Sequence, residues 1–424
     1  MSSIKSSRLY KEVTCPFCSL LCDDLSIRNN SGKMTVARHG CPVAVKNFER
    51  TEPKVTPSIR GHSVSLDEAI NHAALILRNA KQTLFGGSST DVAGSRELMA
   101  LAEKSGAIVD HLHGDSMINN ILVLQNRGWI MTTLAELKNR ADLVIFVGTD
   151  ASSHYPRFFE RFIWNQASLA GLKRNAREIV YLGDELNTRP GINPNGNKPE
   201  LIKCSKNEIN ETLAILRALL NKKNIQSDGI PTRKLASLKK LVEGIHGAQY
   251  GVIVWDAAEF AAEDGDIIIQ TISELIKELN QHSRFSGLSL GGNNGGMTLM
   301  NVCAWQSGYP LRVNYASGQP EYDPFTYSTK RILHNDGADA LFWLSSFNPS
   351  LSLPRTNIPT VILSRPTKRI SPETEVYIPV STPGIDHSGN LFRTDSVVSL
   401  PLKKLRDSTV HSGSEILKRI RLAI

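Results

Sequence analysis

The sequence predicts an α/β protein, with a small cysteine-rich module followed by doubly wound parallel sheets. Four of the six cysteines fall within the first 41 residues. From about residue 62, short apolar runs alternate with longer amphipathic stretches, a pattern typical of parallel strands joined by helices. The chain has 424 residues, which is too many for one ordinary core and suits two or three domains of roughly 100–200 residues each.

The elements follow from local patterns along the chain. The cysteine-rich module ends near the proline-rich segment 53–57. Ser65 and Glu68 form a capping-box pattern, which predicts that a helix starts there and continues through the apolar periodicity of Ala69–Ile76. Further helices are predicted up to about Lys104, and at Glu208–Leu220 and Ile267–Leu279. Strands are predicted at Gln82–Phe85, Ala107–Leu112, Leu143–Val147, Ile179–Leu182, Val252–Trp255, Gly287–Leu290, Ala340–Leu344, Val361–Leu363 and Val376–Val380.

An internal echo suggests two sheets of the same kind. Ala141-Asp-Leu-Val-Ile-Phe-Val leads through a loop to Pro156-Arg157, and Ala338-Asp-Ala-Leu-Phe-Trp-Leu leads through a similar loop to Pro354-Arg355. Both strands run into a polar loop at the carboxyl end, where open α/β sheets bind ligands. The two segments could reflect an internal duplication, or they could arise by chance because Ala-Asp is common before an apolar strand. The predicted domains are 1–55 (cysteine-rich), 56–200 and 201–335 (α/β), and 336–424 (α/β with a basic C-terminal helix).

The net charge of +8 is concentrated at the two ends of the chain. Residues 1–60 hold ten Lys/Arg against five Asp/Glu (+5), and residues 401–424 hold six against two (+4), which leaves −1 for the middle. This distribution argues against a nucleic-acid groove and permits docking of an anionic partner. No apolar run approaches the roughly 18–20 residues that span a bilayer, and the first residues lack a signal-peptide core. We therefore expect a cytoplasmic protein.

The four clustered cysteines predict a metal centre. Cys15, Cys18, Cys22 and Cys41 have x2, x3 and x18 spacings, so that four thiolates can surround one centre. Soft sulfur ligands select a [4Fe–4S] cluster or Zn²⁺, and the uneven spacing favours the cluster because zinc ribbons usually repeat a paired CxxC. Reduced thiols without metal are the alternative. Cys204 and Cys303 stand alone and are expected in the core.

Four blocks of the sequence resemble the B subunit of formylmethanofuran dehydrogenase, a family of molybdopterin/tungstopterin oxidoreductases. The first block is the cysteine segment itself. The others lie throughout the chain, at Thr133–Gly148 with His154–Arg157, at Trp305–Pro310 with Gly318–Pro324, and at Ile378–Asp395. The resemblance implies a small iron–sulfur domain followed by interleaved Rossmann-like domains. It also implies a bis-pterin cofactor with one dinucleotide half at each sheet edge, and a place within a multisubunit complex.

One segment departs from the family pattern. Catalytic members bind the metal through a cysteine in a Cys-His-Gly-Pro stretch, whereas Ser116-Met-Ile-Asn occupies that position here. No cysteine occurs between Cys41 and Cys204. A hydroxyl is a weaker metal ligand than a thiolate unless the metal ionises it.

Two functions follow from this departure. In the first, the Mo/W pterin is absent and the chain is the largely structural B subunit of a bacterial formyltransferase/hydrolase complex. Its partners would be formyltransferase, amidohydrolase-like and small C-type subunits, which pass a formyl group to a methanofuran-type carrier and release it as formate. In the second, Ser116 or Asp115 is an oxygen ligand and the chain is an active Mo/W oxidoreductase. Loss of the flanking His-Gly-Pro favours the first.

Several basic residues are candidates for holding an anion. The resemblance places Lys46 between cluster and pterin, although a solvated lysine is an equal alternative. Lys403, Lys404 and Arg406 could hold a polyanionic carrier or the acidic face of a neighbour.

Two further motifs have weaker functional interpretations. The segment Gly291–Gly296 could approach a phosphate, but an ordinary connection is favoured. His111-Leu-His113 resembles a metal pair of barrel hydrolases without the remaining ligands of such a site.

Overall fold

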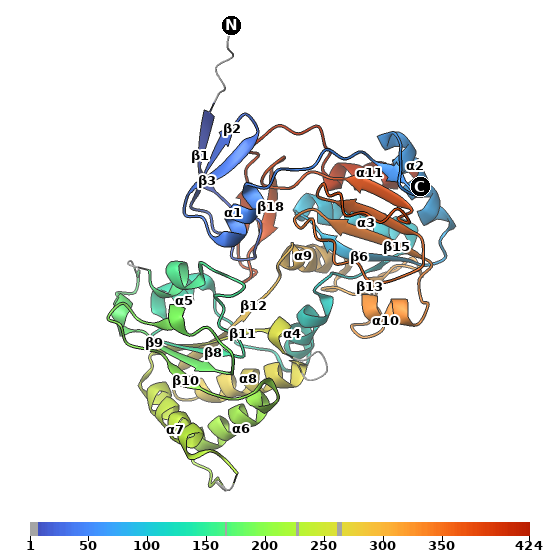
Figure 1. Cartoon of the computed structure of the whole chain (residues 1–424). Coiled ribbons are helices and arrows are strands. Elements are labelled where there is room, and N and C mark those ends of the chain that lie inside the picture. Colours follow the sequence, from blue (N-terminus) through green and yellow to red (C-terminus); the bar gives the residue numbers. More distant parts are fainter. Residues whose placement is uncertain (1–6, 166–167, 226–228, 261–264) are drawn as a thin grey trace. The chain divides into compact units, whose positions relative to one another are not determined.

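A computed structural model describes residues 7–165, 168–225, 229–260 and 265–424 (Figure 1). The chain forms two compact units. We call Met1–Gly114 together with Gly292–Ile424 the split unit, and Asp115–Gly291 the inserted unit. The domain limits predicted at residues 55, 200 and 335 remain a prediction. The nine strands predicted from the sequence all occur, with ends that shift by a few residues.

The split unit begins with the cysteine-rich module. Its three-stranded antiparallel sheet has the order β1-β2-β3 and is followed by helix α1. The bounds are β1 Ser7–Val13, β2 Leu25–Asn30, β3 Lys33–Arg38 and α1 Pro42–Phe48. Phe48 is fully buried and meets Phe17 edge-on at 5.1 Å between ring centroids, so the helix packs onto the cysteine loop.

The main sheet of the split unit has nine strands in the order β14-β13-β7-β6-β15-β16-β17-β4-β5. The five from β7 to β17 are mutually parallel, as predicted, whereas the strands at both edges are antiparallel. Their bounds are β4 Ser58–Ile59, β5 His62–Ser63, β6 Thr83–Ser89, β7 Ile108–Val109, β13 Val313–Asn314, β14 Glu321–Tyr322, β15 Ala340–Ser345, β16 Thr360–Ser364 and β17 Val376–Pro379.

Helices and one hairpin complete the split unit. Helix α11 packs against both α2 and α3, and α3 in turn packs against α9. The bounds are α2 Leu66–Asn79, α3 Val92–Ser105, α9 Gly296–Ser307, α10 Thr329–His334 and α11 Gly413–Ala423, with the hairpin β18 Gly389–Phe392 and β19 Ser399–Leu402. The predicted capping box at Ser65 and Glu68 is present at the start of α2. A side chain at Gly86 would lie 2.7 Å from the Trp343 ring, which explains the glycine there.

The inserted unit is a five-stranded parallel sheet in the order β10-β9-β8-β11-β12. Its strands are β8 Leu143–Val147, β9 Glu178–Leu182, β10 Glu200–Ile202, β11 Tyr250–Asp256 and β12 Arg284–Leu290. Its helices are α5 Leu134–Arg140, α6 Ile209–Leu220, α7 Thr232–Gly247 and α8 Gly265–Leu279, and α4 Gly114–Arg127 leads into the unit. A short π-helix spans Phe159–Ile163.

The sheet of the inserted unit is buried on both faces. Leu143, Ile145 and Val147 join a core with residues of α6, α7 and α8. On the other face, Phe146 stacks on Tyr181 and Phe159 at 5.1 and 5.3 Å. Burial on both faces explains why β8 has no polar residue, as expected for a central parallel strand.

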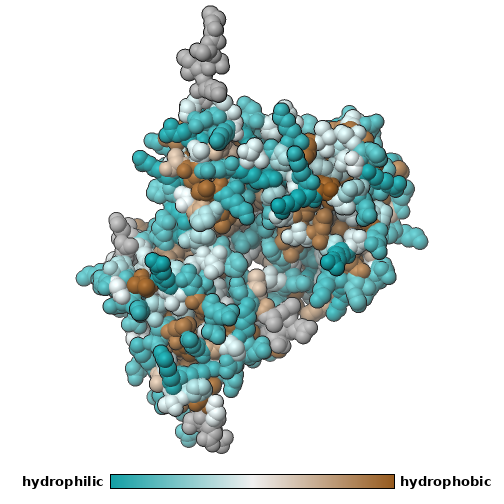
Figure 2. Space-filling view, viewed as in Figure 1, coloured by the Kyte–Doolittle hydropathy of each residue, from teal (hydrophilic) through white to brown (hydrophobic). Residues whose placement is uncertain are grey.

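The described residues contain no helix that is both long enough and apolar enough to span a membrane. Figure 2 shows a largely hydrophilic face with separate apolar patches. Large exposed apolar side chains include Trp305 on α9 and Leu422 on α11.

Candidate functional site

The fold brings the four predicted metal-binding cysteines to one side of the N-terminal module. Cys15, Cys18 and Cys22 lie on the β1–β2 loop, which closes on itself through a hydrogen bond from Cys15 N to Cys22 O at 2.8 Å. Cys41 is the N-cap of α1, where its Sγ accepts a hydrogen bond from Ala44 N at 3.4 Å. The first three thiols are at most 8% exposed, and all four are free of disulfides.

The electrostatics of this cluster suit a cation-containing centre. Burial raises the pKa of the Cys15 thiol well above its usual range, and repulsion from the thiols of Cys18, Cys22 and Cys41 raises it further. Metal ligation requires the thiolate form, and a bound cationic centre offsets this repulsion. The donor set therefore fits a four-thiolate centre.

The sulfur spacing bears on which centre fits. No three of these four cysteines, all within the described ranges, have Sγ atoms within 4.8 Å of one another. In a tetrahedral zinc site, Zn–S bonds of about 2.3 Å hold the sulfurs roughly 3.8 Å apart. An iron–sulfur cluster holds them farther apart because each thiolate binds a different iron. The cysteines thus do not form a ready-made tetrahedral zinc site.

The cysteine loop is tied to distant segments of the split unit. Ser19 donates its backbone N–H to Asn293 Oδ1 at 2.8 Å, and its carbonyl accepts from Thr394 N at 2.8 Å. The Arg365 guanidinium lies 5.4 Å from the centre of the Phe17 ring. The Gly-rich segment that includes Asn293 therefore anchors the loop, a role that its sequence did not suggest.

The position that replaces the family's metal-binding cysteine lies at the start of α4. Ser116 is half-buried in the first helical turn, next to an exposed Asp115. Met117 and Ile118, which stand where the family has His and Gly, are buried at 6% and 2% exposure. Apolar packing has therefore replaced the polar flank of a metal ligand.

In the split unit, the predicted cofactor-edge motif forms a buried polar cluster. Ser381 Oγ lies 2.9 Å from His387 Nδ1, and Thr382 N donates to Asp386 Oδ2 at 2.8 Å. Burial lowers the pKa of His387 and raises that of Asp91, while the two groups attract each other. The sequence pointed to Ser381–His387 but gave no sign of Asp91, which comes from the start of α3.

The position of Asp91 makes this edge of the sheet unsuitable for a dinucleotide phosphate. Its carboxyl caps α3 by accepting from Gly94 N at 3.0 Å, so an acidic group already lies where a helix N-terminus would receive an anion. A side chain at Gly389 would lie 2.3 Å from Asp91 Oδ2, so the chain also packs closely over this end of the helix.

The corresponding edge of the inserted unit is occupied by Asp150, just beyond β8. Its two carboxylate oxygens accept from Ser152 Oγ (3.0 Å), Ser153 N (2.8 Å), Ser153 Oγ (2.9 Å) and Asn187 N (3.1 Å). These are the donors that a phosphate would need. Together with the hydroxyl at Ser116, the groups at these two edges do not fit a metal-bearing bis-pterin.

The candidate basic residues differ in how far they are engaged. Lys46 is exposed on α1. Lys403 Nζ donates to Lys11 O at 2.9 Å, and Lys404 pairs with the exposed Asp407 at 2.7 Å. Arg406 is ion-paired with Asp386 at 2.6 Å, and both side chains are largely buried. Its charge therefore neutralises Asp386 within the cofactor-edge motif.

The histidine pair has a structural role. His111 Nδ1 accepts from His113 N at 3.1 Å, and its Nε2 lies 3.3 Å from Asn294 O. Burial lowers the pKa of His111 to about 3. Both ring nitrogens of His111 are thus engaged within the chain, and neither is left for a metal.

The Ala-Asp echo has an equivalent structural role in both sheets. Asp142 accepts hydrogen bonds from Gln249 N and Tyr250 N at 2.8 and 2.9 Å, at the start of β11. Asp339 accepts from Lys81 N and Gln82 N at 2.8 and 3.0 Å, just before β6. Each aspartate therefore anchors the neighbouring parallel strand. The repeated Ala-Asp pattern was visible in the sequence, but the backbone N–H groups that bind the two aspartates were not.

No protein-family model matches the chain. It is 25% identical over 438 residues to the B subunit of tungsten-containing formylmethanofuran dehydrogenase 2 from Methanocaldococcus jannaschii, with 97% of each chain covered. It is 27% identical over 376 residues to the B subunit of the formyltransferase/hydrolase complex Fhc from Methylorubrum extorquens, with 86% of this chain and 96% of the relative covered.

A solved structure agrees with these relatives. The chain superimposes with a TM-score of 0.72 and 25% identity on a chain of the formyltransferase/hydrolase complex FhcABCD from Methylorubrum extorquens, determined with methylofuran. The match covers 86% of this chain and 98% of the other. The mixed α/β fold is therefore shared over most of both chains, and the homologues of this chain are named as the B subunits of formylmethanofuran dehydrogenase and of Fhc.

Proposed function

We propose that the chain is the B subunit of a formyltransferase/hydrolase complex. It assembles with formyltransferase, amidohydrolase-like and small C-type subunits, and the complex uses a methanofuran-type carrier and releases the formyl group as formate. The formyl chemistry belongs to the other subunits, and this chain has a structural role. One observation supports this choice: where the resemblance predicts a metal-binding cysteine, the chain has Ser116, with buried Met117 and Ile118 beside it.

The competing function is a Mo/W oxidoreductase in which Ser116 or Asp115 binds the metal. Metal analysis of the purified complex separates the two. We expect no Mo or W, and no viologen-reducing activity. Stoichiometric Mo or W with pterin fluorescence, and a reductase activity that Ser116→Ala abolishes, would overturn the structural assignment.

We also propose that Cys15, Cys18, Cys22 and Cys41 hold a [4Fe–4S] cluster that stabilises the N-terminal module, with Zn²⁺ as the second candidate. When bound, the centre supplies folding free energy. Iron, sulfide and zinc are measured on the intact complex. Cys18→Ser should lower the metal content and loosen the module in hydrogen exchange, whereas Cys303→Ser, which removes a lone core thiol, should leave the metal content unchanged. Equal metal content in both variants contradicts the site.

The exposed lysines at the chain ends are proposed to hold the acidic carrier or an acidic neighbouring subunit. Lys403 and Lys11 are brought together by their hydrogen bond, and Lys46 lies on the same module. Reversing Lys403 and Lys404 to Glu should weaken carrier retention or complex assembly. Reversing the exposed Lys222 and Lys223 is the matched control. Arg406 is left intact because Asp386 needs its charge.

A further inference from the structure

The split unit carries an exposed aromatic surface that lies outside the candidate sites described above. Trp305, on the last turn of α9, is 60% exposed, and Val397, in the turn between β18 and β19, is 57% exposed. Tyr309, just beyond the end of α9, is 36% exposed. We call these three residues the aromatic patch, together with Phe392 and Tyr322, which pack against Trp305 and Tyr309.

The first half of the patch is held by contacts between α9 and the β18–β19 hairpin (Figure 1). The Trp305 ring meets Phe392 edge-on, with 5.3 Å between ring centroids, and Phe392 N donates to Thr298 Oγ1 at 2.9 Å. One turn before Trp305, the side chains of Asn301 and Ser396 are hydrogen-bonded at 3.0 Å. Since residues three and four apart lie on one side of a helix, α9 binds the hairpin along the face that ends in Trp305.

The second half of the patch starts from the same end of α9. The helix is closed by Gly308, whose backbone is left-handed (φ +82°), and Tyr309 N donates to Ser307 Oγ at 3.1 Å. The Tyr309 ring stacks on Tyr322 with 5.2 Å between centroids and 12° between planes. Tyr322 belongs to β14, the edge strand of the main sheet. The exposed rings are therefore held in place before any partner binds, which lowers the entropic cost of binding.

A cluster of this kind differs from a single exposed apolar residue. Isolated apolar side chains are common on the surface of monomers, whereas contiguous apolar patches mark binding surfaces. Trp and Tyr are also enriched among the residues that dominate the energy of protein–protein interfaces. Leu422 on α11 is 68% exposed, but it follows Lys418, Arg419 and Arg421 on a charged helix. The aromatic patch, in contrast, has the composition of an interface.

The charges around the patch indicate the kind of partner. Helix α9 contains no Asp, Glu, Lys or Arg. On the hairpin, Arg393 and Asp395 neutralise each other through an ion pair at 2.6 Å. The charged residues beside Tyr322 are Glu321 and Asp323, and Asp323 accepts from the N–H groups of the following turn. A polyanion finds no cation on α9, and a strongly charged surface would leave its charges unpaired there. The patch therefore fits an uncharged, apolar protein surface.

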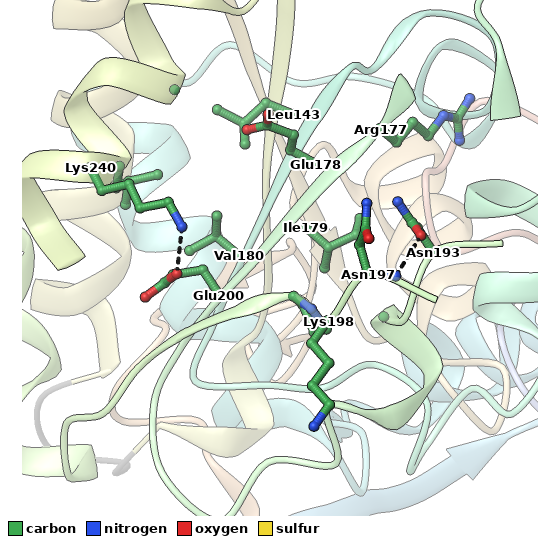
Figure 3. Close-up of a pocket in the computed structure, with 14 residues that line it drawn as sticks. Leu143, Arg177, Glu178, Ile179, Val180, Asn193, Asn197, Lys198, Glu200 and Lys240 are labelled. Atoms are coloured by element: carbon green, nitrogen blue, oxygen red, sulfur yellow. Dashed lines mark hydrogen bonds and ion pairs between the residues drawn. The ribbon is translucent and has the colours of Figure 1, made fainter. Parts of the chain in front are cut away.

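A pocket in the inserted unit has the opposite character. It has a volume of about 320 Å³, and its lining includes Glu178, Lys198, Glu200 and Lys240. Figure 3 shows Lys240 directed at Glu200, with the ammonium and a carboxylate oxygen 3.0 Å apart. A partner at this pocket would have to match or displace charged groups, which is not required at the aromatic patch.

We propose that the aromatic patch is the docking surface for one neighbouring subunit of the complex, and that this subunit presents an uncharged, apolar face to it. Trp305 is the main anchor, and Tyr309, Phe392 and Val397 surround it. The inference rests on the proposed function, because it takes the partner from the heteromeric complex. It differs from the role proposed for the basic chain ends, which concerns acidic groups.

Purification of the intact complex through a tag on this chain tests the inference. Native mass spectrometry of a dilution series measures the concentration at which each formyltransferase, amidohydrolase-like or C-type subunit dissociates. Trp305→Ser should raise this concentration at least tenfold for one subunit, because a buried tryptophan anchor is lost. In oxidative footprinting, Trp305 should react at least fivefold more slowly in the complex than in the chain alone.

Two further variants separate docking from folding and from general surface hydrophobicity. Val397→Glu changes an exposed residue, so it keeps the fold, and its charge should weaken the contact of the same subunit. Leu422→Ser is the matched control, because it removes a more exposed apolar side chain away from the patch and should leave dissociation within twofold.

The outcomes that contradict the inference are distinct. If the wild-type complex forms and Trp305→Ser behaves like Leu422→Ser, the inference alone is overturned. If the chain alone forms a dimer that Trp305→Ser dissociates, the patch binds a second copy and the assignment to another subunit is wrong. If the wild-type chain recovers none of these subunits, the proposed function fails, and this inference fails with it.

Discussion

The two units use the same device to align their central strands, but two of their buried arginines, Arg365 and Arg177, have different partners. In each sheet, an aspartate before a central strand accepts two consecutive N–H groups at the start of the neighbouring strand. Each unit also buries two arginines at no more than 4% exposure, Arg312 and Arg365 in the split unit and Arg157 and Arg177 in the inserted unit. The partners of these arginines are of different kinds.

Arg365 is bound by a charged partner. Its guanidinium contacts Glu52 Oε1 at 2.7 Å and also donates to Asn47 O and Phe347 O. In the inserted unit, Arg177 donates to the carbonyls of Phe162, Ile163 and Lys138, with no carboxylate partner among the described residues, and burial lowers its pKa to about 10. The carboxylate-bound arginine joins a separate module to a sheet, whereas the carbonyl-bound arginine joins the ends of two nearby helical segments.

The largest predicted effect concerns Arg365. Arg365→Met removes one of the two cations paired with Glu52, the other being Arg50, and also the donors to Asn47 O and Phe347 O, so we expect a loss of about 3 kcal/mol in the free energy of unfolding. Urea unfolding of the full chain measures it. Arg177→Met leaves three carbonyls without a donor but no unpaired charge, so its loss should be smaller, about 1–3 kcal/mol. If Arg177→Met lowered the free energy of unfolding by more than Arg365→Met does, the expected order of the two partners would be contradicted.

The shared aspartates predict an intermediate effect. Asp142→Ala and Asp339→Ala each remove an acceptor from two N–H groups, which should cost about 1–3 kcal/mol. Asp142 is half-buried and Asp339 is exposed, so the loss should be greater for Asp142. Urea unfolding of both variants measures this, with Asp407→Ala, at a side chain 98% exposed, as the control. Losses no larger than that of the control would mean that the echo is not a structural device.

The smallest predicted effect is a pH response confined to the split unit. His111 has a folded pKa of about 3, below its ordinary value of 6.5, so between these values the unfolded chain binds a proton that the folded chain does not. Stability should therefore fall as the pH drops below 6.5, by up to about 1.4 kcal/mol per pH unit from this residue.

Hydrogen exchange at pH 7 and pH 5 measures this response. The split unit should lose protection as the pH falls, and His111→Gln should reduce that loss. The inserted unit, whose histidines His154, His246 and His282 are exposed, should change less. Equal losses in the two units, unaffected by the substitution, would contradict the role of His111.

Much of the fold could be predicted because periodicity is local. Strand β8 was predicted with its observed limits, and the parallel order follows from alternating strands and helices. The edge strands could not be found in this way: β10 has three residues and β4 only two, too short for a pattern. The predicted purely parallel sheet was therefore wrong at the edges of the split unit, where short antiparallel strands complete it.

The site residues that could be predicted from the sequence are those whose spacing along the chain indicates their chemistry. The four cysteines are close in sequence and in space. Asp91 lies almost 300 positions from His387, and nothing local in the sequence relates the two. Trp305 is one of five tryptophans until its exposure distinguishes it. Partnerships that depend on tertiary contacts are therefore accessible only from the folded chain.

The interruption of one unit by the other sets an order of events during synthesis. All strands of the inserted unit come from one continuous stretch, so this unit can close as soon as residue 291 has left the ribosome. The split unit must wait for β15, β16 and β17 before its main sheet is complete, and for α11 before α2 and α3 are covered. Until then β6 has only β7 beside it and its other edge is open, in the kind of state that aggregates or recruits chaperones.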